Sequence, residues 1–172
     1  MGIAKLTTGI PGFDMLTHGG IPEGRSTLVV GRSGTGKTVF ALQTAAHLAR
    51  HNVPVLIVGI EESADDLVAT ADGLGLELTE LREAGLIHVA DLTRPMDGPT
   101  VVSGDYDLYG LIHRLEAAVR DRNVKVVVID SATALFSPRP PQDQLRNHFF
   151  QLVHTLRRLN VTGVILAESP QD

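Results

Sequence analysis

Residues 31–38 combine residue types whose spacing could bind phosphate. They read GRSGTGKT, with glycines at positions 31, 34 and 36, followed directly by Lys37 and Thr38. The segment matches G-x-x-x-x-G-K-[ST] at every fixed position, and it stands after a strand-like run and before a helix-like run, as the motif requires. Glycines let successive backbone N–H groups point inward, and the N-terminus of the helix adds its positive end. The sequence therefore predicts a P-loop that binds the phosphates of a nucleoside triphosphate.

Two side chains of this loop have separate tasks in the predicted site. Lys37 reaches the β- and γ-phosphates as a point charge, and the hydroxyl of Thr38 is a ligand for Mg²⁺. The alternative is a glycine-rich turn with a chance Lys-Thr pair, which the flanking strand and helix argue against.

A bound metal needs a carboxylate opposite the loop, and residues 126–130 provide one. They read VVVID, a β-branched run that ends in Asp130. A buried strand of this kind delivers its last side chain to the carboxyl edge of a parallel sheet, where ligands bind. We expect Asp130 to hold Mg²⁺ directly or through water; the alternative is a cap on the following turn.

Hydrolysis also needs a group that orients or deprotonates water. Glu61 and Glu62 immediately follow the apolar run VPVLIVGI, and they lie near the γ-phosphate if that strand neighbours the strand of Asp130. Alternation along a strand points only one of them inward, unless the turn relaxes that rule. The alternative is that the acidic run EESADD interacts with a helix dipole. Periodicity does not choose between the two glutamates.

Other polar residues have ordinary structural explanations. His47 and His51, four residues apart, have the spacing of a metal pair, but we expect them to complement a helix C-terminus. Ser131 and Thr133 could contact or accept phosphate, although hydroxyls after a strand commonly cap turns. The last helix-like segment carries residues of one apolar packing face and not of a base-stacking platform: Phe149, Phe150, Leu152, Val153 and Leu156.

Five apolar runs of strand length alternate with helix-like segments. The runs are STLVVG, VPVLIVGIE, LIHVADL, VKVVVID and VTGVILAE, and such continuous runs are typical of strands buried on both faces. Helices are expected from Thr38 to about Arg50, from the capping box at Ser63 to Gly73, at Glu80–Ala84, within 107–123 and within 141–160. Loops are expected at 92–105 and 137–142. The alternation predicts an α/β fold, a mostly parallel β-sheet with helices on both faces, and one domain over residues 1–172.

Composition argues against several classes of protein. Fifteen basic and twenty acidic residues give a net charge of −5 without a basic cluster, so a general nucleic-acid surface is not expected. The absence of cysteine rules out disulfides and thiolate metal sites. No run has the length of a bilayer span and the N-terminus has no signal-peptide pattern, so we expect a cytoplasmic protein without membrane contact.

Several motifs together resemble a known superfamily. The run LTTGIPGFDMLTHGGIPEGRSTLVVGRSGTGKT is similar to the opening signature of the RecA/RadA/KaiC ATPases. With GIEES, LIHVADL and VVVIDSATALF in register, the chain resembles the KaiC circadian-clock family, most closely its N-terminal, ATP-hydrolysing half. The resemblance implies a RecA-like P-loop NTPase fold, ATP and Mg²⁺ as cofactors, a hexameric ring with slow hydrolysis at subunit interfaces, and KaiA- and KaiB-like partners.

The resemblance also implies roles for individual residues. Catalysis is assigned to Glu61 and Glu62 with Lys37, and the metal to Thr38 and Asp130. Binding of the nucleotide phosphates is assigned to the loop: Ser33, Gly34, Thr35, Gly36, Lys37, Thr38 and Val39.

The chain departs from the family after the strand VTGVILAE. The family domain continues there with further strands and a basic finger that reaches a neighbour's γ-phosphate, so we expect a fold truncated at its C-terminal end, with the P-loop strand at the sheet edge. Nucleotide binding is then the firmer expectation, because a trans-acting basic finger contributes strongly to turnover. One alternative function is a non-hydrolysing nucleotide-dependent scaffold. Another is a RadA-like DNA-recombination module, against which the loop SATALFSPRPPQDQ, with one Arg and one Asp, argues.

Overall fold

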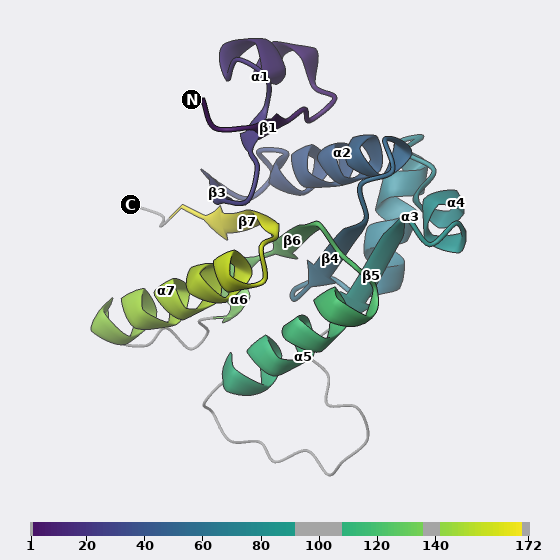
Figure 1. The fold of residues 1–172 in the computed structure, drawn as a ribbon. Coiled ribbons are helices and arrows are strands. Elements are labelled where there is room, and N and C mark those ends of the chain that lie inside the picture. Colours follow the sequence, from purple (N-terminus) through teal and green to yellow (C-terminus); the bar gives the residue numbers. More distant parts are fainter. Residues whose placement is uncertain (1, 92–107, 136–141, 170–172) are drawn as a thin grey trace.

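The computed structural model describes residues 2–91, 108–135 and 142–169 (Figure 1). In chain order its elements are β1 (Lys5–Leu6), α1 (Pro11–Leu16), β2 (Ile21–Pro22), β3 (Ser26–Gly31), α2 (Lys37–Arg50), β4 (Val55–Gly59), α3 (Ala64–Gly73), α4 (Leu78–Glu83), β5 (Ile87–Asp91), α5 (Leu108–Asp121), β6 (Val126–Asp130), α6 (Ala132–Leu135), α7 (Gln142–Arg158) and β7 (Thr162–Glu168).

A five-stranded parallel sheet forms the centre of the fold. Its strands lie in the order β3-β7-β6-β4-β5, and every neighbouring pair is parallel. The short strands β1 and β2 form a separate antiparallel pair. All five residues of β4 and the first four of β6 are buried, which explains their continuous apolar sequences. The predicted parallel sheet is therefore confirmed.

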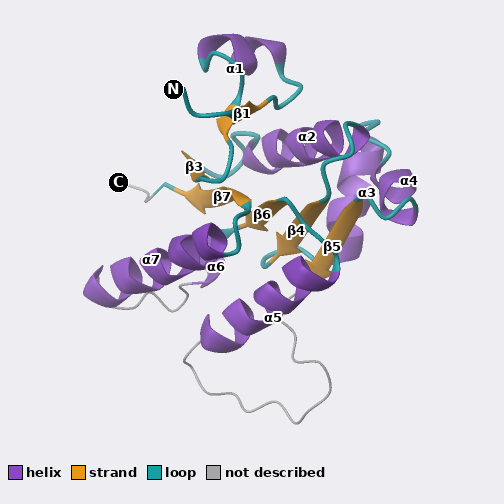
Figure 2. Cartoon of the chain, in the orientation of Figure 1, coloured by secondary structure: helices purple, strands orange, loops and turns teal. Residues whose placement is uncertain are grey.

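Helices cover both faces of this sheet, as the alternating sequence predicts (Figures 1 and 2). One buried cluster packs α2, α3 and α4 against strand residues such as Ile57 and Val128. The second packs α5 and α7 against residues such as Leu56 and Ile129. Neighbouring residues of one strand enter opposite clusters because successive side chains point to opposite faces.

The local signals for helices are mostly confirmed. The Ser63 hydroxyl accepts a hydrogen bond from the Asp66 backbone N–H at 3.2 Å and donates one to the Asp66 carboxylate at 2.6 Å, so Ser63 caps the start of α3 as predicted. Helix α4 begins two residues before the predicted Glu80, within the usual uncertainty of helix ends. The prediction did not include α1, α6, β1 or β2. The predicted loop at 92–105 and residues 137–141 of the predicted loop 137–142 lie outside the described residues. Its last residue, Gln142, begins α7.

One packing prediction was wrong at Phe150. Leu152 and Leu156 are buried in the second cluster and Phe149 packs against it, but Phe150 is 59% exposed. Consecutive residues of a helix are separated by about 100° around its axis, and Phe150 falls outside the stripe that Phe149, Leu152, Val153 and Leu156 turn toward the sheet. The guanidinium of Arg146 lies 5.9 Å from the centre of the Phe150 ring.

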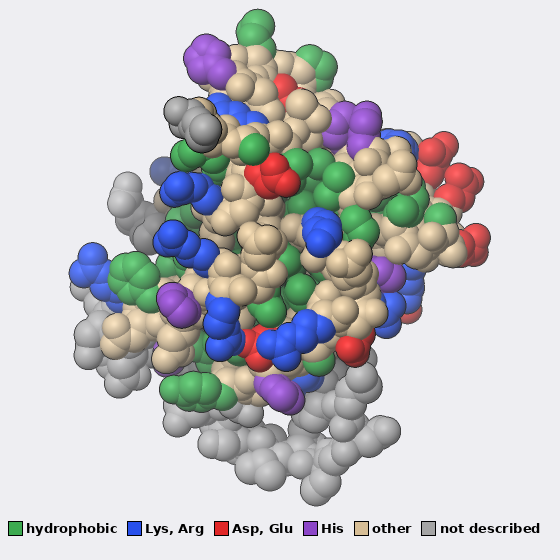
Figure 3. Space-filling view, viewed as in Figure 1, with side chains coloured by type: hydrophobic (Ala, Val, Ile, Leu, Met, Phe, Trp, Pro, Cys, Tyr) green, Lys and Arg blue, Asp and Glu red, His purple; other side chains and the backbone are tan. Residues whose placement is uncertain are grey.

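The P-loop strand β3 lies at the edge of the described sheet, as expected. It pairs only with β7 among the described strands, and Leu28 and Val30 are 48% and 54% exposed. Figure 3 shows basic side chains interspersed with hydrophobic ones on the face of α5 and α7, and acidic side chains gathered over α3 and α4. None of the described helices is long and apolar enough to cross a membrane.

Candidate active site

The loop between β3 and α2 has the backbone geometry of an anion site. Gly34 and Gly36 adopt left-handed φ values of 77° and 89°, which glycine reaches without steric cost. A Cβ on Gly31 would lie 2.6 Å from Thr35 Oγ1, so the loop closes tightly on its own first residue. Helix α2 starts directly after Gly36, and the N–H groups in the first turn of a helix have no intrahelical acceptors. These donors and the dipole of α2 lie where a phosphate would bind.

Lys37 lies folded over this loop. Its Nζ donates a hydrogen bond to the carbonyl oxygen of Arg32 at 2.8 Å, and Thr35 Oγ1 donates to the same oxygen at 2.8 Å. Residues 32–36 are otherwise exposed. A phosphate that engages Lys37 therefore replaces a bond within the loop.

Thr38 and Asp130 meet across the sheet edge. Thr38 Oγ1 donates a hydrogen bond to Asp130 Oδ2 at 2.7 Å, although the two residues are 92 positions apart in the chain. Burial raises the pKa of Asp130, while the hydrogen bond from Thr38 and the charge of Lys37 lower it in part. The carboxylate thus lies in a site where a cation would offset the cost of its desolvation.

The bend that carries Glu61 and Glu62 follows the end of β4, which lies beside the end of β6 and Asp130. Gly59 pairs with Asp130 in the sheet register, and the Ile60 N–H donates to the Asp130 carbonyl at 2.8 Å. The strand ends at Gly59 and both glutamates lie in the following bend, so strand alternation does not apply to them.

The surroundings of Glu62 change the pKa of its carboxyl group. Partial burial raises the pKa of Glu62, and the negative charges of Asp130, Asp66 and Glu61 raise it further.

The family model described as ATPase: KaiC matches residues 6–172. The chain belongs to the KaiC ATPase family. It is 41% identical over 168 residues to a circadian clock oscillator protein KaiC of Picosynechococcus sp., with 97% of this chain and 32% of the relative covered. It is 41% identical over 169 residues to a protein of the same name from Prochlorococcus marinus, with 98% and 34% covered. The chain thus spans about one third of the length of these relatives, and the predicted family and RecA-like α/β fold are confirmed.

Two hydroxyls that follow Asp130 in this KaiC-family chain have different surroundings. Thr133 Oγ1 accepts a hydrogen bond from the Glu168 N–H at 2.7 Å, which fixes α6 against the end of β7. Ser131 is 2% exposed, and its Oγ has no hydrogen-bond partner among the described residues. The expected structural role therefore fits Thr133 but leaves Ser131 unexplained.

The histidines of α2 bind neighbouring protein groups. The His47 and His51 rings lie 4.3 Å apart, His51 Nδ1 is hydrogen-bonded to the His47 carbonyl at 2.8 Å, and His47 Nε2 to Thr7 Oγ1 at 2.9 Å. No group of three or more potential metal ligands occurs among the described His, Cys, Asp and Glu residues. His47 therefore joins α2 of the KaiC-family fold to its N-terminal segment.

Glu168 is a further candidate site residue, which the sequence motifs did not predict. Strand β7 lies between β3 and β6, and Glu168 pairs with Gly31 at the start of the P-loop. Val164 and Leu166 pack in the cluster under α2, so alternation places Glu168 on the same side of the sheet as Asp130. The sequence did contain a signal for Glu168, because the apolar run VTGVILAE ends in an acid just as the run VVVID ends in Asp130.

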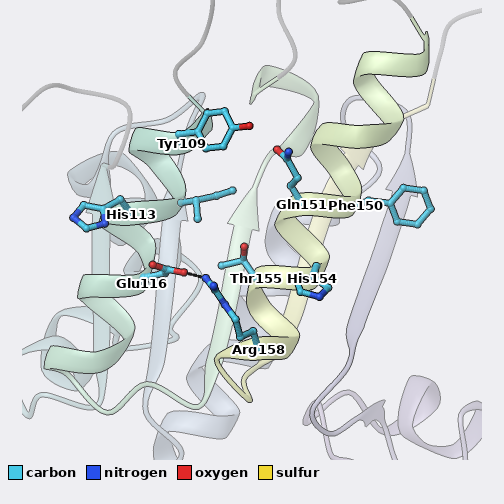
Figure 4. A pocket seen from close by; sticks show the side chains of 9 residues that line it. Tyr109, His113, Glu116, Phe150, Gln151, His154, Thr155 and Arg158 are labelled. Carbon is cyan, nitrogen blue, oxygen red and sulfur yellow. Dashed lines mark hydrogen bonds and ion pairs between the residues drawn. The ribbon is translucent and has the colours of Figure 1, made fainter.

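A separate groove of about 600 Å³ lies between α5 and α7 (Figure 4). Glu116 and Arg158 form an ion pair across it, and Tyr109 and Phe150 are exposed on its two walls. None of the predicted phosphate-binding, metal-binding or catalytic residues of the KaiC-family site lines this groove.

Proposed function

We propose that residues 1–172 form one domain that binds ATP with Mg²⁺ and hydrolyses it. The observation that carries this proposal is the Thr38–Asp130 hydrogen bond of 2.7 Å, which joins the first turn after the glycine loop to the acid at the end of β6. A phosphate-binding loop next to a buried carboxylate is the arrangement on which nucleoside triphosphate hydrolysis by P-loop proteins depends. Membership of the KaiC ATPase family supports the same chemistry.

The donor set at this position fits Mg²⁺. The Thr38 hydroxyl and the Asp130 carboxylate are hard oxygen donors that already lie together, and Mg²⁺ prefers such ligands. When bound, Mg²⁺ neutralises phosphate charge and orients the transferred group.

Other groups of the protein bind the phosphates and accept the proton from water. The loop amides of residues 33–39 and the Nζ of Lys37 bind the phosphate oxygens. We assign Glu62 as the group that accepts a proton from water as the water oxygen attacks the γ-phosphorus and the bond to the bridging oxygen breaks. Glu62 is assigned this role because partial burial and the charge of Asp130 raise the pKa of Glu62, which makes it a better proton acceptor than an ordinary carboxylate.

Assembly is part of the proposal. Residues 32–36 are exposed in the isolated chain, so a second subunit could cover the open side of a bound nucleotide. We propose that the chain forms a hexameric ring that depends on ATP, as the family resemblance implies. The relatives are called circadian clock oscillator proteins, and we extend that role, with KaiA- and KaiB-like partners, to this chain.

The test measures MgATP affinity by calorimetry and phosphate release for the wild type and three variants. Lys37→Ala is expected to weaken ATP binding about ten- to a hundredfold, because it removes a charged donor to phosphate. Glu62→Gln is expected to slow phosphate release about a hundredfold while ATP affinity is kept, and the matched Glu61→Gln variant is expected to slow it less. Unchanged binding by Lys37→Ala contradicts the site. Unchanged turnover in both glutamine variants contradicts the roles given to Glu61 and Glu62. A wild type that binds MgATP without releasing phosphate supports the non-hydrolysing scaffold instead.

A further inference from the structure

The carbonyl oxygen of Arg32 is the atom on which the P-loop closes in this structure. It accepts hydrogen bonds from Thr35 Oγ1 and from Lys37 Nζ, each at 2.8 Å, and a longer one from the Thr35 N–H at 3.3 Å. A carbonyl oxygen has two lone pairs, so the two short bonds use its ordinary acceptor capacity. Thr35 and Lys37 therefore donate to the same atom side by side.

The Thr35 hydroxyl lies inside the loop, close to the side chain of Lys37. A Cβ on Gly31 would lie 2.6 Å from Thr35 Oγ1 and 3.6 Å from Lys37 Cδ, so both side chains pass directly over Gly31. The positive φ of 77° at Gly34 lets the chain turn between Arg32 and Thr35. The fold of the loop thus brings a second donor to the carbonyl that holds Lys37.

Binding of a triphosphate requires Lys37 to leave this carbonyl, because a P-loop lysine donates to phosphate oxygens. A carbonyl oxygen that loses its strong donor beside a phosphate is unfavourable for two reasons. It becomes a polar group without a good partner, and its partial negative charge repels the phosphate. The Thr35 hydroxyl reduces both costs if it stays on the carbonyl when the amine leaves.

We propose that Thr35 is a positioning residue whose hydroxyl keeps the Arg32 carbonyl hydrogen-bonded while Lys37 transfers from that carbonyl to the phosphates. This inference rests on the proposed MgATP site and deepens it. It assigns the hydroxyl to the backbone of the loop and not to the triphosphate or the metal, so Thr35 acts on ATP affinity through Lys37.

The experiment compares the wild type with Thr35→Val and Thr35→Ser by calorimetry with MgATP. Valine keeps the shape of the side chain without the hydroxyl, and it is expected to weaken ATP binding about three- to tenfold, the value of one hydrogen bond. Serine keeps the hydroxyl and is expected to bind within about twofold of the wild type. Thr44→Val is the matched control, because Thr44 Oγ1 donates to the Phe40 carbonyl at 2.8 Å within α2, and its ATP affinity is expected to stay unchanged.

A double-mutant cycle with Lys37→Ala separates an effect through Lys37 from a direct contact. In the Lys37→Ala chain no amine has to leave the carbonyl, so adding Thr35→Val is expected to change the remaining affinity by less than about twofold. A hydroxyl that contacts the phosphates, or one that only holds the turn, produces the same fold loss in both backgrounds.

Three results overturn the inference while the proposed function stands: an unchanged MgATP affinity in Thr35→Val, an equal loss from Thr35→Val with and without Lys37, or a loss in Thr35→Ser as large as that in Thr35→Val. If the wild type takes up no MgATP, both the proposed function and this inference fail, and the wild-type titration alone shows it.

Discussion

At the scale of single residues, the candidate site depends on glycines whose missing side chains leave room for it. A Cβ on Gly59, at the end of β4, would lie 2.5 Å from the Glu62 carbonyl oxygen and 2.9 Å from Leu67 Cδ1. The bend that carries Glu62 therefore passes directly over Gly59, and its position is coupled to the size of that residue. The contact is with backbone, so a small shift of a flexible side chain cannot relieve it.

Gly59→Ala is expected to displace this bend. We expect it to lower the free energy of unfolding by about 1–3 kcal/mol, the usual cost of overpacking, and to slow phosphate release while ATP affinity changes little. Urea unfolding, phosphate release and calorimetry measure the three quantities.

The matched control is Gly73→Ala, where a Cβ meets nothing within 4 Å at the end of α3. It is expected to stabilise the protein by about 0.5–1 kcal/mol and to leave turnover unchanged. Normal turnover in the Gly59→Ala variant would contradict the proposed role of Glu62 in hydrolysis.

At the scale of elements, helix α2 connects the site to the N-terminal segment through His47. The ring of His47 is hydrogen-bonded to Thr7, and a Cβ on Gly9 would lie 2.5 Å from the ring, so the segment packs closely against it. Burial lowers the pKa of His47, the neighbouring His51 and Arg50 of α2 lower it further, and Asp14 of α1 raises it in part.

This environment predicts that acid weakens the fold through His47. Because the folded state holds the neutral ring, the contribution of His47 to stability is complete above its unfolded pKa of about 6.5, and it is lost as the pH falls through the lower folded-state pKa. The midpoint of urea unfolding is expected to decrease from pH 7 to pH 5, and His47→Gln is expected to flatten that decrease. His113→Gln on α5 is the control, and an equal effect of both variants would contradict the assignment.

At the scale of the whole molecule, the edge strand β3 and the open P-loop suggest two different modes of association. The exposed Leu28 and Val30 form an apolar sheet edge, which invites pairing with another chain. The proposed ring, in contrast, depends on bound nucleotide and on the exposed loop.

Leu28→Lys is expected to reduce association that occurs without nucleotide and to leave assembly with MgATP in place. Light scattering after size-exclusion chromatography, with and without MgATP, measures both. Leu74→Lys is the matched control, because Leu74 is another exposed leucine away from β3. Equal behaviour of the two variants would exclude a specific role of the β3 edge.

Much of the architecture follows from local sequence signals. The five apolar runs became the five parallel strands, and Ser63 caps the start of α3 as predicted. The short α1 was missed because its six residues carry Pro and Gly at the start and bury none of their side chains, so it has no apolar periodicity. Phe150 was wrongly predicted to lie on the packing face of α7. The spacing of apolar residues indicates that a helix has an apolar face, but it does not fix the width of that face.

The sequence by itself determined the residue types of the site: a glycine loop with Lys37 and Thr38, and acids at the ends of apolar runs. These are local properties, since loop conformation and strand burial depend on neighbouring residues. Only the tertiary structure decided which acids meet the loop. The strand order brings Asp130 to within a hydrogen bond of Thr38 and Glu168 to the register of Gly31. Strand order is fixed by packing between residues far apart in the chain, which no local pattern records.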